Sequence, residues 1–228
     1  MIDGGGQLGV IFDMDGVLVD TGWAHRQAWF DLAAQEGLAM SDEFFRKTFG
    51  MQNNAILPLM QPGISEAEMT RLSDWKERRY REVVQERPEL AAGTETLLKD
   101  LKQHGFRLAI GSSAPPENLE VFWNGCGLVA YFDARVTNEE IRESKPSPET
   151  FLRAAQKLGL PPERCAVIED AVPGVQAGRA AGMTVVAVTT THSRDKLADA
   201  DYVVDDLTCL KATDFLKLLR KTEAASDV

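Results

Sequence analysis

Short apolar runs alternate with longer segments along this chain. The first run begins at Val10, and similar runs occupy residues 108–110, 166–168 and 184–188. The segments between them are long enough to hold helices, and such alternation is typical of βαβ units whose strands form a parallel sheet. We therefore predict an α/β fold with a parallel sheet at its centre.

Residues 23–88, which lie between the first two runs, have helical periodicity. Apolar side chains recur on one face of residues 23–36, with polar side chains between them. Ser65 and Glu68 fit a capping box, which would start a long charged helix that continues through Arg87. The segment therefore predicts a helical insertion in the α/β fold.

Acidic and hydroxyl side chains occur where the first three apolar runs end. Ligands of an open α/β sheet bind in the crevice beyond the carboxyl ends of its strands, so these side chains occupy the default position of a functional site. Unpaired carboxylates are costly there, and a hard cation is the simplest way to compensate them. The residues are Asp13 and Asp15 after the first run, Ser112 and Ser113 after the second, and Glu169 and Asp170 after the third.

These residue types, together with Lys145, match what phosphoryl transfer requires. The reaction needs a nucleophile, a counter-ion for the anions, and donors to the phosphoryl oxygens. We assign Asp13 as the nucleophile, since an aspartate oxygen can attack phosphorus, and Asp15 as the general acid and base. The Ser112 hydroxyl would donate to a phosphoryl oxygen, and Lys145 would bridge the phosphoryl group and the Asp13 carboxylate.

The predicted cofactor is Mg²⁺, which neutralises the repulsion between anions and orients the phosphoryl group. Its expected ligands are Asp13, Glu169, Asp170 and the backbone carbonyl of Asp15. Each feature has an ordinary explanation when it stands alone, because serine starts helices, lysine is usually solvated and an acidic pair often lies in a turn. The combination of these separated elements favours one site.

This combination resembles the haloacid dehalogenase superfamily of phosphotransferases, and within it the β-phosphoglucomutase-like phosphatases. The likeness covers nearly the whole chain. It implies that Asp13 forms an aspartyl-phosphate and that Asp15 protonates the leaving oxygen, in agreement with the roles assigned above. The matching residues are the run from Asp13 to Thr21, Ser112, the Lys145-Pro146 step, the run from Ile168 to Asp170, Gly174 and the Ala181-Gly182 pair.

The resemblance also implies a domain organisation. Residues 1–22 and 89–228 would form a Rossmann-like three-layer core with a parallel sheet. Residues 23–88 would form a small α-helical cap that is inserted after the first motif.

Substrate contacts are expected from both domains. In the cap, His25, Trp29, Gly50 and Lys76 match positions of the mutase branch of the family, and in the core Ser113 is assigned to the same substrate site. His25 could instead make a structural hydrogen bond, and Trp29 could belong to the core of the cap.

One departure from the mutase branch concerns the distal phosphate. Mutases place an arginine shortly after the cap glycine, whereas residues 51–53 of this chain are Met-Gln-Asn. Lys76 could replace that cation, as could Arg46 or Lys47. The first prediction is therefore a Mg²⁺-dependent phosphatase for a sugar or polyol phosphate. The alternative is a β-phosphoglucomutase that interconverts β-glucose 1-phosphate and glucose 6-phosphate.

Two non-enzymatic classes use similar residues. A signalling receiver domain also has an acidic pair, a phosphorylated aspartate, a hydroxyl residue and a lysine, and its phosphate acts as a switch. Receivers are shorter, and the helical insertion and the pair Glu169 and Asp170 favour an enzyme. A non-catalytic binding module on the same scaffold is disfavoured because no residue of the motifs is lost.

Composition limits the partners and the compartment. The chain of 228 residues has a net charge of −10, which argues against a nucleic-acid surface because phosphate backbones call for clustered lysine and arginine. Its three cysteines lack metal-ligand spacing and indicate a reducing cytoplasm. Neither a leader nor a run of about 18 apolar residues is found. We expect a cytoplasmic monomer or weak dimer that binds a small phosphorylated metabolite, no nucleic acid and no membrane.

Overall fold

The computed structural model describes residues 6–49 and 51–226 and divides into two compact units. The first unit contains the chain up to Asp20 and from Glu89 onward, and the second is Thr21–Pro88. The second unit is therefore an insertion in the first. Its role as a cap stays a prediction.

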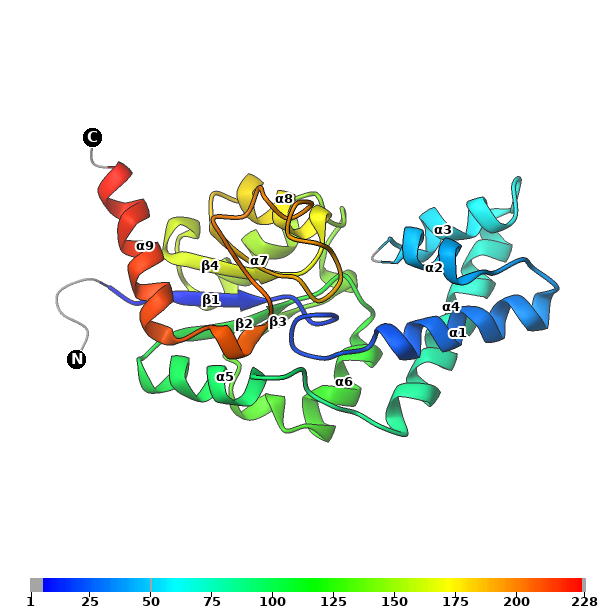
Figure 1. The fold of residues 1–228 in the computed structure, drawn as a ribbon, viewed down its shortest axis with the longest axis horizontal. Coiled ribbons are helices and arrows are strands. Elements are labelled where there is room, and N and C mark those ends of the chain that lie inside the picture. The colour runs from blue at the N-terminus through cyan, green and yellow to red at the C-terminus, as the bar shows by residue number, and fades with distance from the viewer. Residues whose placement is uncertain (1–5, 50, 227–228) are drawn as a thin grey trace. The chain divides into compact units, whose positions relative to one another are not determined.

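A six-stranded sheet forms the centre of the first unit (Figure 1). The strands are β1 (Gly9–Phe12), β2 (Arg107–Gly111), β3 (Ala134–Val136), β4 (Cys165–Glu169), β5 (Thr184–Val188) and β6 (Tyr202–Val204). Their order is β3-β2-β1-β4-β5-β6, and all paired neighbours are parallel, so the predicted parallel α/β sheet is confirmed. The edge strands β3 and β6 were not predicted, because three residues are too few to show a period.

β1 lies at the centre of this sheet, between β2 and β4. Val10, Ile11 and Phe12 are fully buried. Both faces of a parallel sheet are covered, which is why this strand is a continuous apolar run and not an alternating one. Phe12 pairs with Ile110 of β2 and with Ile168 of β4. The residues that follow these three positions therefore emerge side by side at one edge of the sheet.

Helices cover both faces of the sheet and complete a three-layer core (Figure 1). They are α5 (Thr94–Gln103), α6 (Pro116–Gly125), α7 (Glu149–Leu158), α8 (Val172–Ala180) and α9 (Ala212–Ser226), with short 3-10 turns at Leu128–Ala130, Asn138–Glu140, Pro162–Arg164 and Leu207–Cys209. α7 and α8 pack on one face, where Ile11 and Val167 share a buried cluster with Phe151 and Ala177. α5 lies along the opposite face and contacts α9.

The second unit, Thr21–Pro88, is helical. It contains α1 (Gly22–Glu36), α2 (Asp42–Thr48), α3 (Asn53–Met60) and α4 (Glu66–Gln85), whose apolar sides share one buried cluster. The Ser65 hydroxyl accepts a hydrogen bond from the Glu68 N–H at 3.2 Å, which confirms the predicted start of the long helix. That helix ends at Gln85, two residues before the predicted end. Among residues 6–49 and 51–226, no helix has the length and hydrophobicity needed to cross a membrane.

Candidate active site

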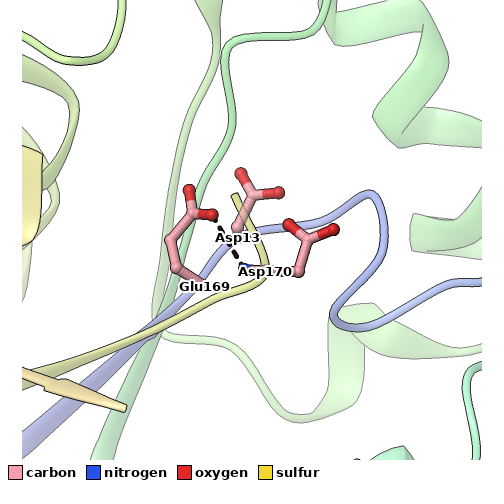
Figure 2. A group of neighbouring side chains, drawn as sticks. All are labelled: Asp13, Glu169 and Asp170. Carbon is pink, nitrogen blue, oxygen red and sulfur yellow. Dashed lines mark hydrogen bonds between the residues drawn. The ribbon is translucent and has the colours of Figure 1, made fainter. Parts of the chain in front are cut away.

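Three carboxylates meet at the edge of the sheet where β1 and β4 end. Asp13 follows β1, Glu169 is the last residue of β4, and Asp170 comes next. Oxygen atoms of all three lie within 4.8 Å of one another, and Figure 2 shows the three side chains. The register explains this meeting, because Phe12 and Ile168 are paired and the Asp13 N–H donates to the Ile168 carbonyl at 3.0 Å.

Lys145 brings a positive charge to this cluster from the loop that precedes α7. Its Nζ lies 2.5 Å from Asp13 Oδ1 and 2.6 Å from Glu169 Oε1. Burial alone would lower the pKa of Lys145, but the charges of Asp13 and Glu169 outweigh burial and hold that pKa above its ordinary value. Lys145 is therefore a permanent cation beside Asp13.

The single positive charge of Lys145 does not neutralise the three carboxylates of the cluster. Burial raises the pKa of Asp13 to about 7, while Lys145 opposes this rise and Glu169 adds to it. Burial, followed by the charges of Glu169 and Asp13, raises the pKa of Asp170 well above its ordinary value. Since three acids share one ammonium group, a divalent cation would complete the balance of charge.

The donor atoms of this cluster suit a hard divalent cation. Glu169 is already bonded, because Oε1 accepts from Lys145 and Oε2 accepts from the N–H groups of Asp170 at 2.9 Å and Ala171 at 3.0 Å. The carboxylates of Asp13 and Asp170 could hold the cation, with Glu169 within reach. The cluster offers carboxylate oxygens, which Mg²⁺ prefers, and no sulfur or imidazole, which softer metals prefer. The residues present therefore fit Mg²⁺.

Two glycines leave room for the acidic side chains. Gly174 lies near the start of α8 against Glu169, and a Cβ at Gly174 would overlap the Glu169 carboxylate. Gly16 has a φ of +78°, in the left-handed region, and a Cβ at Gly16 would overlap the Asp170 carboxylate. An alanine at either position would displace an acid of the cluster.

Asp15 lies in a tight loop immediately after β1. The N–H groups of Leu18 and Val19 both donate to the Met14 carbonyl, at 2.9 and 3.2 Å. Asp15 is half-buried, and its charge adds to burial in raising the pKa of Asp13. The loop therefore keeps the second acid within electrostatic reach of the first while leaving it partly open to solvent.

Ser112 and Ser113 follow the end of β2. The Ser112 N–H donates to the Val136 carbonyl of β3 at 3.0 Å, and the Ser112 hydroxyl accepts from the Ala114 N–H at 3.1 Å. Because β2 is the neighbour of β1, Ser112 emerges at the same edge of the sheet as Asp13. The Ser113 hydroxyl oxygen is buried and has no hydrogen-bond partner within the described part of the chain. It could therefore donate to a bound ligand.

Two residues that were predicted to contact the substrate lie together in the helical unit. Lys76 is 2% exposed, and its Nζ lies 2.9 Å from His25 Nδ1 and 2.8 Å from Glu77 Oε1. The His25 ring stacks on the Tyr80 ring with their centroids 4.0 Å apart. Lys76, His25 and Glu77 therefore form one polar cluster inside this unit, and contact with the substrate stays a prediction.

Trp29 and Gly50 are the other two predicted contacts of the helical unit. Trp29 is 3% exposed and belongs to the apolar core of that unit, with Lys76 Nζ 5.5 Å from the centre of its ring. Gly50 lies outside the described residues. The role of both residues toward the substrate stays a prediction.

Two threonines after β5, which the sequence analysis did not consider, contact the site. Thr190 Oγ1 donates to the Gly16 carbonyl at 2.5 Å. Thr191 lies close enough to Asp170 to oppose, through its side chain, the rise of the Asp170 pKa that burial causes. A signal for them was available, because the fourth apolar run is also followed by hydroxyl residues, from Thr189 to Thr191. The rule that located polar groups after the first three runs applies equally to this one.

Glu149, which was also missed, anchors the loop that carries Lys145. Its Oε2 accepts from the N–H groups of Arg142 at 2.8 Å and Glu143 at 3.0 Å, and its Oε1 accepts from Arg153 Nε at 2.8 Å. The bonds from the Glu143 N–H, the Arg153 side chain and the Arg142 N–H lower the pKa of Glu149 to about 2. Its sequence position gave no signal, because an acid in the first turn of a helix is common.

Comparison with known proteins agrees with this geometry. The family model of haloacid dehalogenase-like hydrolases matches residues 10–188. The fructose-1-phosphate phosphatase YqaB of Escherichia coli is 36% identical over 188 residues, which cover 79% of this chain and 95% of that protein. Hexitol phosphatase A of Escherichia coli is 35% identical over 209 residues, which cover 90% of this chain and 94% of that protein.

A solved structure extends the likeness to the whole fold. The crystal structure of β-phosphoglucomutase from Clostridium difficile superposes with a TM-score of 0.84 at 28% identity, covering 96% of this chain and 100% of that one. The residues matched by the family model include Asp13, Lys145 and Asp170, so the resemblance noted from the motifs is confirmed. The chain therefore belongs to the haloacid dehalogenase-like hydrolase family, and it is a phosphoric monoester hydrolase or a closely related phosphomutase.

Proposed function

We propose that the protein is a Mg²⁺-dependent phosphatase that hydrolyses a small phosphorylated metabolite, a sugar or polyol phosphate, through an aspartyl-phosphate on Asp13. The observation that carries this proposal is the 2.5 Å ion pair between Lys145 and Asp13 inside a cluster of buried carboxylates. The named activities of the two Escherichia coli relatives, a fructose-1-phosphate phosphatase and a hexitol phosphatase, support the substrate class.

The reaction proceeds in two steps that use both aspartates of the loop after β1. In the first, an oxygen of Asp13 attacks the phosphorus, the bond from phosphorus to the substrate oxygen breaks, and Asp15 donates a proton to that leaving oxygen. In the second, water attacks the aspartyl-phosphate and gives a proton to Asp15, which releases inorganic phosphate and restores the Asp13 carboxylate. The partial exposure of Asp15 and its reach to Asp13 suit both proton transfers.

The remaining core residues hold the phosphoryl oxygens and compensate their charge. Lys145 stays protonated and bridges Asp13 and a phosphoryl oxygen, while Glu169 keeps the ammonium group in place at 2.6 Å. The hydroxyls of Ser112 and Ser113 donate to other phosphoryl oxygens. Mg²⁺, when bound, supplies further positive charge and orients the phosphoryl group.

A β-phosphoglucomutase is the second candidate, because the Clostridium difficile enzyme of that name matches the fold at 28% identity. A mutase needs a cation for the distal phosphate, and residues 51–53 lack the expected arginine. Lys76 is one of the cations that could replace it, but its Nζ is paired with Glu77 Oε1 at 2.8 Å. A lysine whose charge is already matched attracts a second phosphate less strongly, and this favours the phosphatase.

A product assay separates the two candidates. The full chain is given β-glucose 1-phosphate with a glucose bisphosphate primer and, separately, a panel of sugar and polyol phosphates, each with Mg²⁺ and with a chelator. We expect inorganic phosphate to be released from at least one sugar or polyol phosphate, and chelation to stop the release. Conversion to glucose 6-phosphate without phosphate release would establish the mutase instead. The Asp13→Asn variant sets the background of both assays.

The compartment and the oligomeric state belong to the same proposal. Cys165 and Cys209 form no disulfide, which supports a reducing compartment such as the cytoplasm. A small phosphorylated metabolite needs no partner chain, so we expect a monomer or weak dimer. Size-exclusion chromatography with light scattering measures the second expectation directly.

A further inference from the structure

The aromatic ring of Phe151, a residue of α7, lies against the ammonium group of Lys145. Lys145 Nζ is positioned over the face of this ring, 4.6 Å from its centre. An ammonium group within about 6 Å of an aromatic face is attracted to the negative charge of that face, most strongly where water is excluded. Phe151 is fully buried and the Lys145 side chain is largely buried, so this contact is of the stronger kind.

The position of the ring is fixed by the sheet against which it packs. Phe151 belongs to the buried apolar cluster that also contains Ile11 of β1 and Val136 of β3. Gly111, at the end of β2, lets the ring come close to the backbone, because a Cβ at Gly111 would lie 3.2 Å from Phe151 Cδ1. That separation is shorter than the optimal distance between carbon atoms. The ammonium group of Lys145 therefore meets an aromatic surface that has little room to move.

The ring supplies an attraction that the proposed reaction leaves unchanged. A lysine side chain has a flexible four-carbon stem, so its ammonium group needs several partners to stay in one place. Asp13 and Glu169 accept from Lys145 Nζ at 2.5 and 2.6 Å, but the charge of Asp13 changes when one of its oxygens bonds to phosphorus. The charge distribution of the Phe151 ring stays the same. The ring can therefore hold the ammonium group both before and after Asp13 has reacted.

We propose that Phe151 is a positioning residue that holds the Lys145 ammonium group in place for the phosphoryl group. This inference rests on the phosphate-binding role of Lys145 in the proposed function. Phe151 acts through Lys145, because an ammonium group that is in place for only part of the time lowers the apparent affinity for its ligand by that fraction.

A series of ring fluorinations in the full chain tests this role. Phenylalanine analogues with one, two and three ring fluorines at position 151 nearly keep the shape of the ring and progressively remove the negative charge of its face. Calorimetric titration of sodium phosphate in the presence of MgCl₂ should show stepwise weaker binding, which reaches about 10-fold with three fluorines. Phe151→Leu, which has no aromatic face, should bind phosphate at least as weakly.

The matched control is the same fluorine series at Phe215 of α9. Phe215 is also fully buried, and its ring centroid lies 6.4 Å from that of Phe106. Phe106 directly precedes β2, whereas Ser112 follows that strand, so Phe215 packs near the opposite edge of the sheet from the site. Fluorination of Phe215 should therefore leave the affinity for phosphate near that of the wild type.

A double substitution separates positioning from a purely structural role. Three fluorines at position 151 should lower Tm more in the wild-type background than in Lys145→Met, which has no positive charge for the ring to attract. Equal phosphate affinity across the Phe151 series would overturn the inference, and so would an equal change in Tm in the two backgrounds. A wild type that binds no phosphate would overturn the phosphate-binding role of Lys145 itself, which is a different result.

Discussion

Lys145 Nζ and Asp13 Oδ1 lie 2.5 Å apart although 132 positions separate the two residues in the sequence. Both side chains are largely buried, with 10% and 12% of their surface exposed. A buried ion pair adds little net stability, because the loss of hydration offsets the attraction. The pair is therefore better explained by chemistry, since the lysine favours the ionised form of Asp13, which is the form that acts as the nucleophile in the proposed reaction.

Replacing Asp13 with asparagine tests the covalent route. Asparagine has nearly the same shape but is a poor nucleophile, so turnover should fall to background. Burial and the charge of Glu169 already disfavour the ionised Asp13, so the variant should melt no lower than the wild type. Phosphate release and thermal melting measure the two effects, and preserved turnover would contradict an aspartyl-phosphate.

Replacing Lys145 with alanine tests the phosphate-binding role of the lysine. Loss of one member of a buried charge pair weakens binding by about 2–5 kcal/mol, so kcat/KM and the affinity for inorganic phosphate should both fall by this amount. Lys157→Ala is the control, because Lys157 pairs with Glu140 at the surface with 41% of its side chain exposed. Equal phosphate affinity in Lys145→Ala and Lys157→Ala would place Lys145 outside the site.

Replacing Glu149 with alanine tests whether the loop around Lys145 must be anchored. Its carboxylate accepts from the N–H groups of Arg142 and Glu143, so the variant releases this part of the loop and lets Lys145 move. A displacement of about 1 Å at a reacting group can reduce the rate about 100-fold, so kcat should fall by about 10- to 100-fold. Glu143→Ala, on an exposed side chain of the same loop, should leave kcat near the wild-type value. A wild-type kcat in Glu149→Ala would show that Lys145 is held without it.

The central strands were predictable from the sequence and the edge strands were not. β1, β2, β4 and β5 are covered on both faces, so they are visible as continuous apolar runs. β3 contains Arg135 and β6 begins with the exposed Tyr202, and each pairs with one neighbour only. Their position in the sheet depends on hydrogen bonds to β2 and β5, which no local period records.

The positions of the acidic residues were also predictable from the order of the strands, whereas the positions of the loop residues around them were not. In-register parallel strands carry the residues after Phe12 and Ile168 to one place, and this follows from sequence order alone. The positions of Thr191 and Glu149 depend on loops whose paths are set by tertiary packing. Lys76 and Glu77 are adjacent on a helix, where successive side chains do not face each other, so their ion pair also depends on the buried surroundings of Lys76.

The raised pKa of Asp13 predicts that Mg²⁺ stabilises the protein more strongly at higher pH. The pKa of this acid rises from an ordinary 3.8 to about 7 in the folded chain, chiefly through burial. Between these values the folded state binds more protons than the unfolded state, so without metal the free energy of unfolding falls as pH increases through this window. Because Mg²⁺ competes with the proton for the carboxylate, its binding should tighten over the same window.

Thermal melting with Mg²⁺ and with a chelator measures this linkage. The increase in Tm caused by Mg²⁺ should be larger at about pH 8.5 than at about pH 5.5, because binding to the folded state alone raises Tm according to the affinity. In Asp13→Asn the increase should be smaller at both pH values and should depend less on pH, since Asp13 no longer titrates. An increase in Tm that is the same at both pH values in the wild type would mean that Mg²⁺ binds without displacing a proton from Asp13, and the cation would then have to be held by other oxygens.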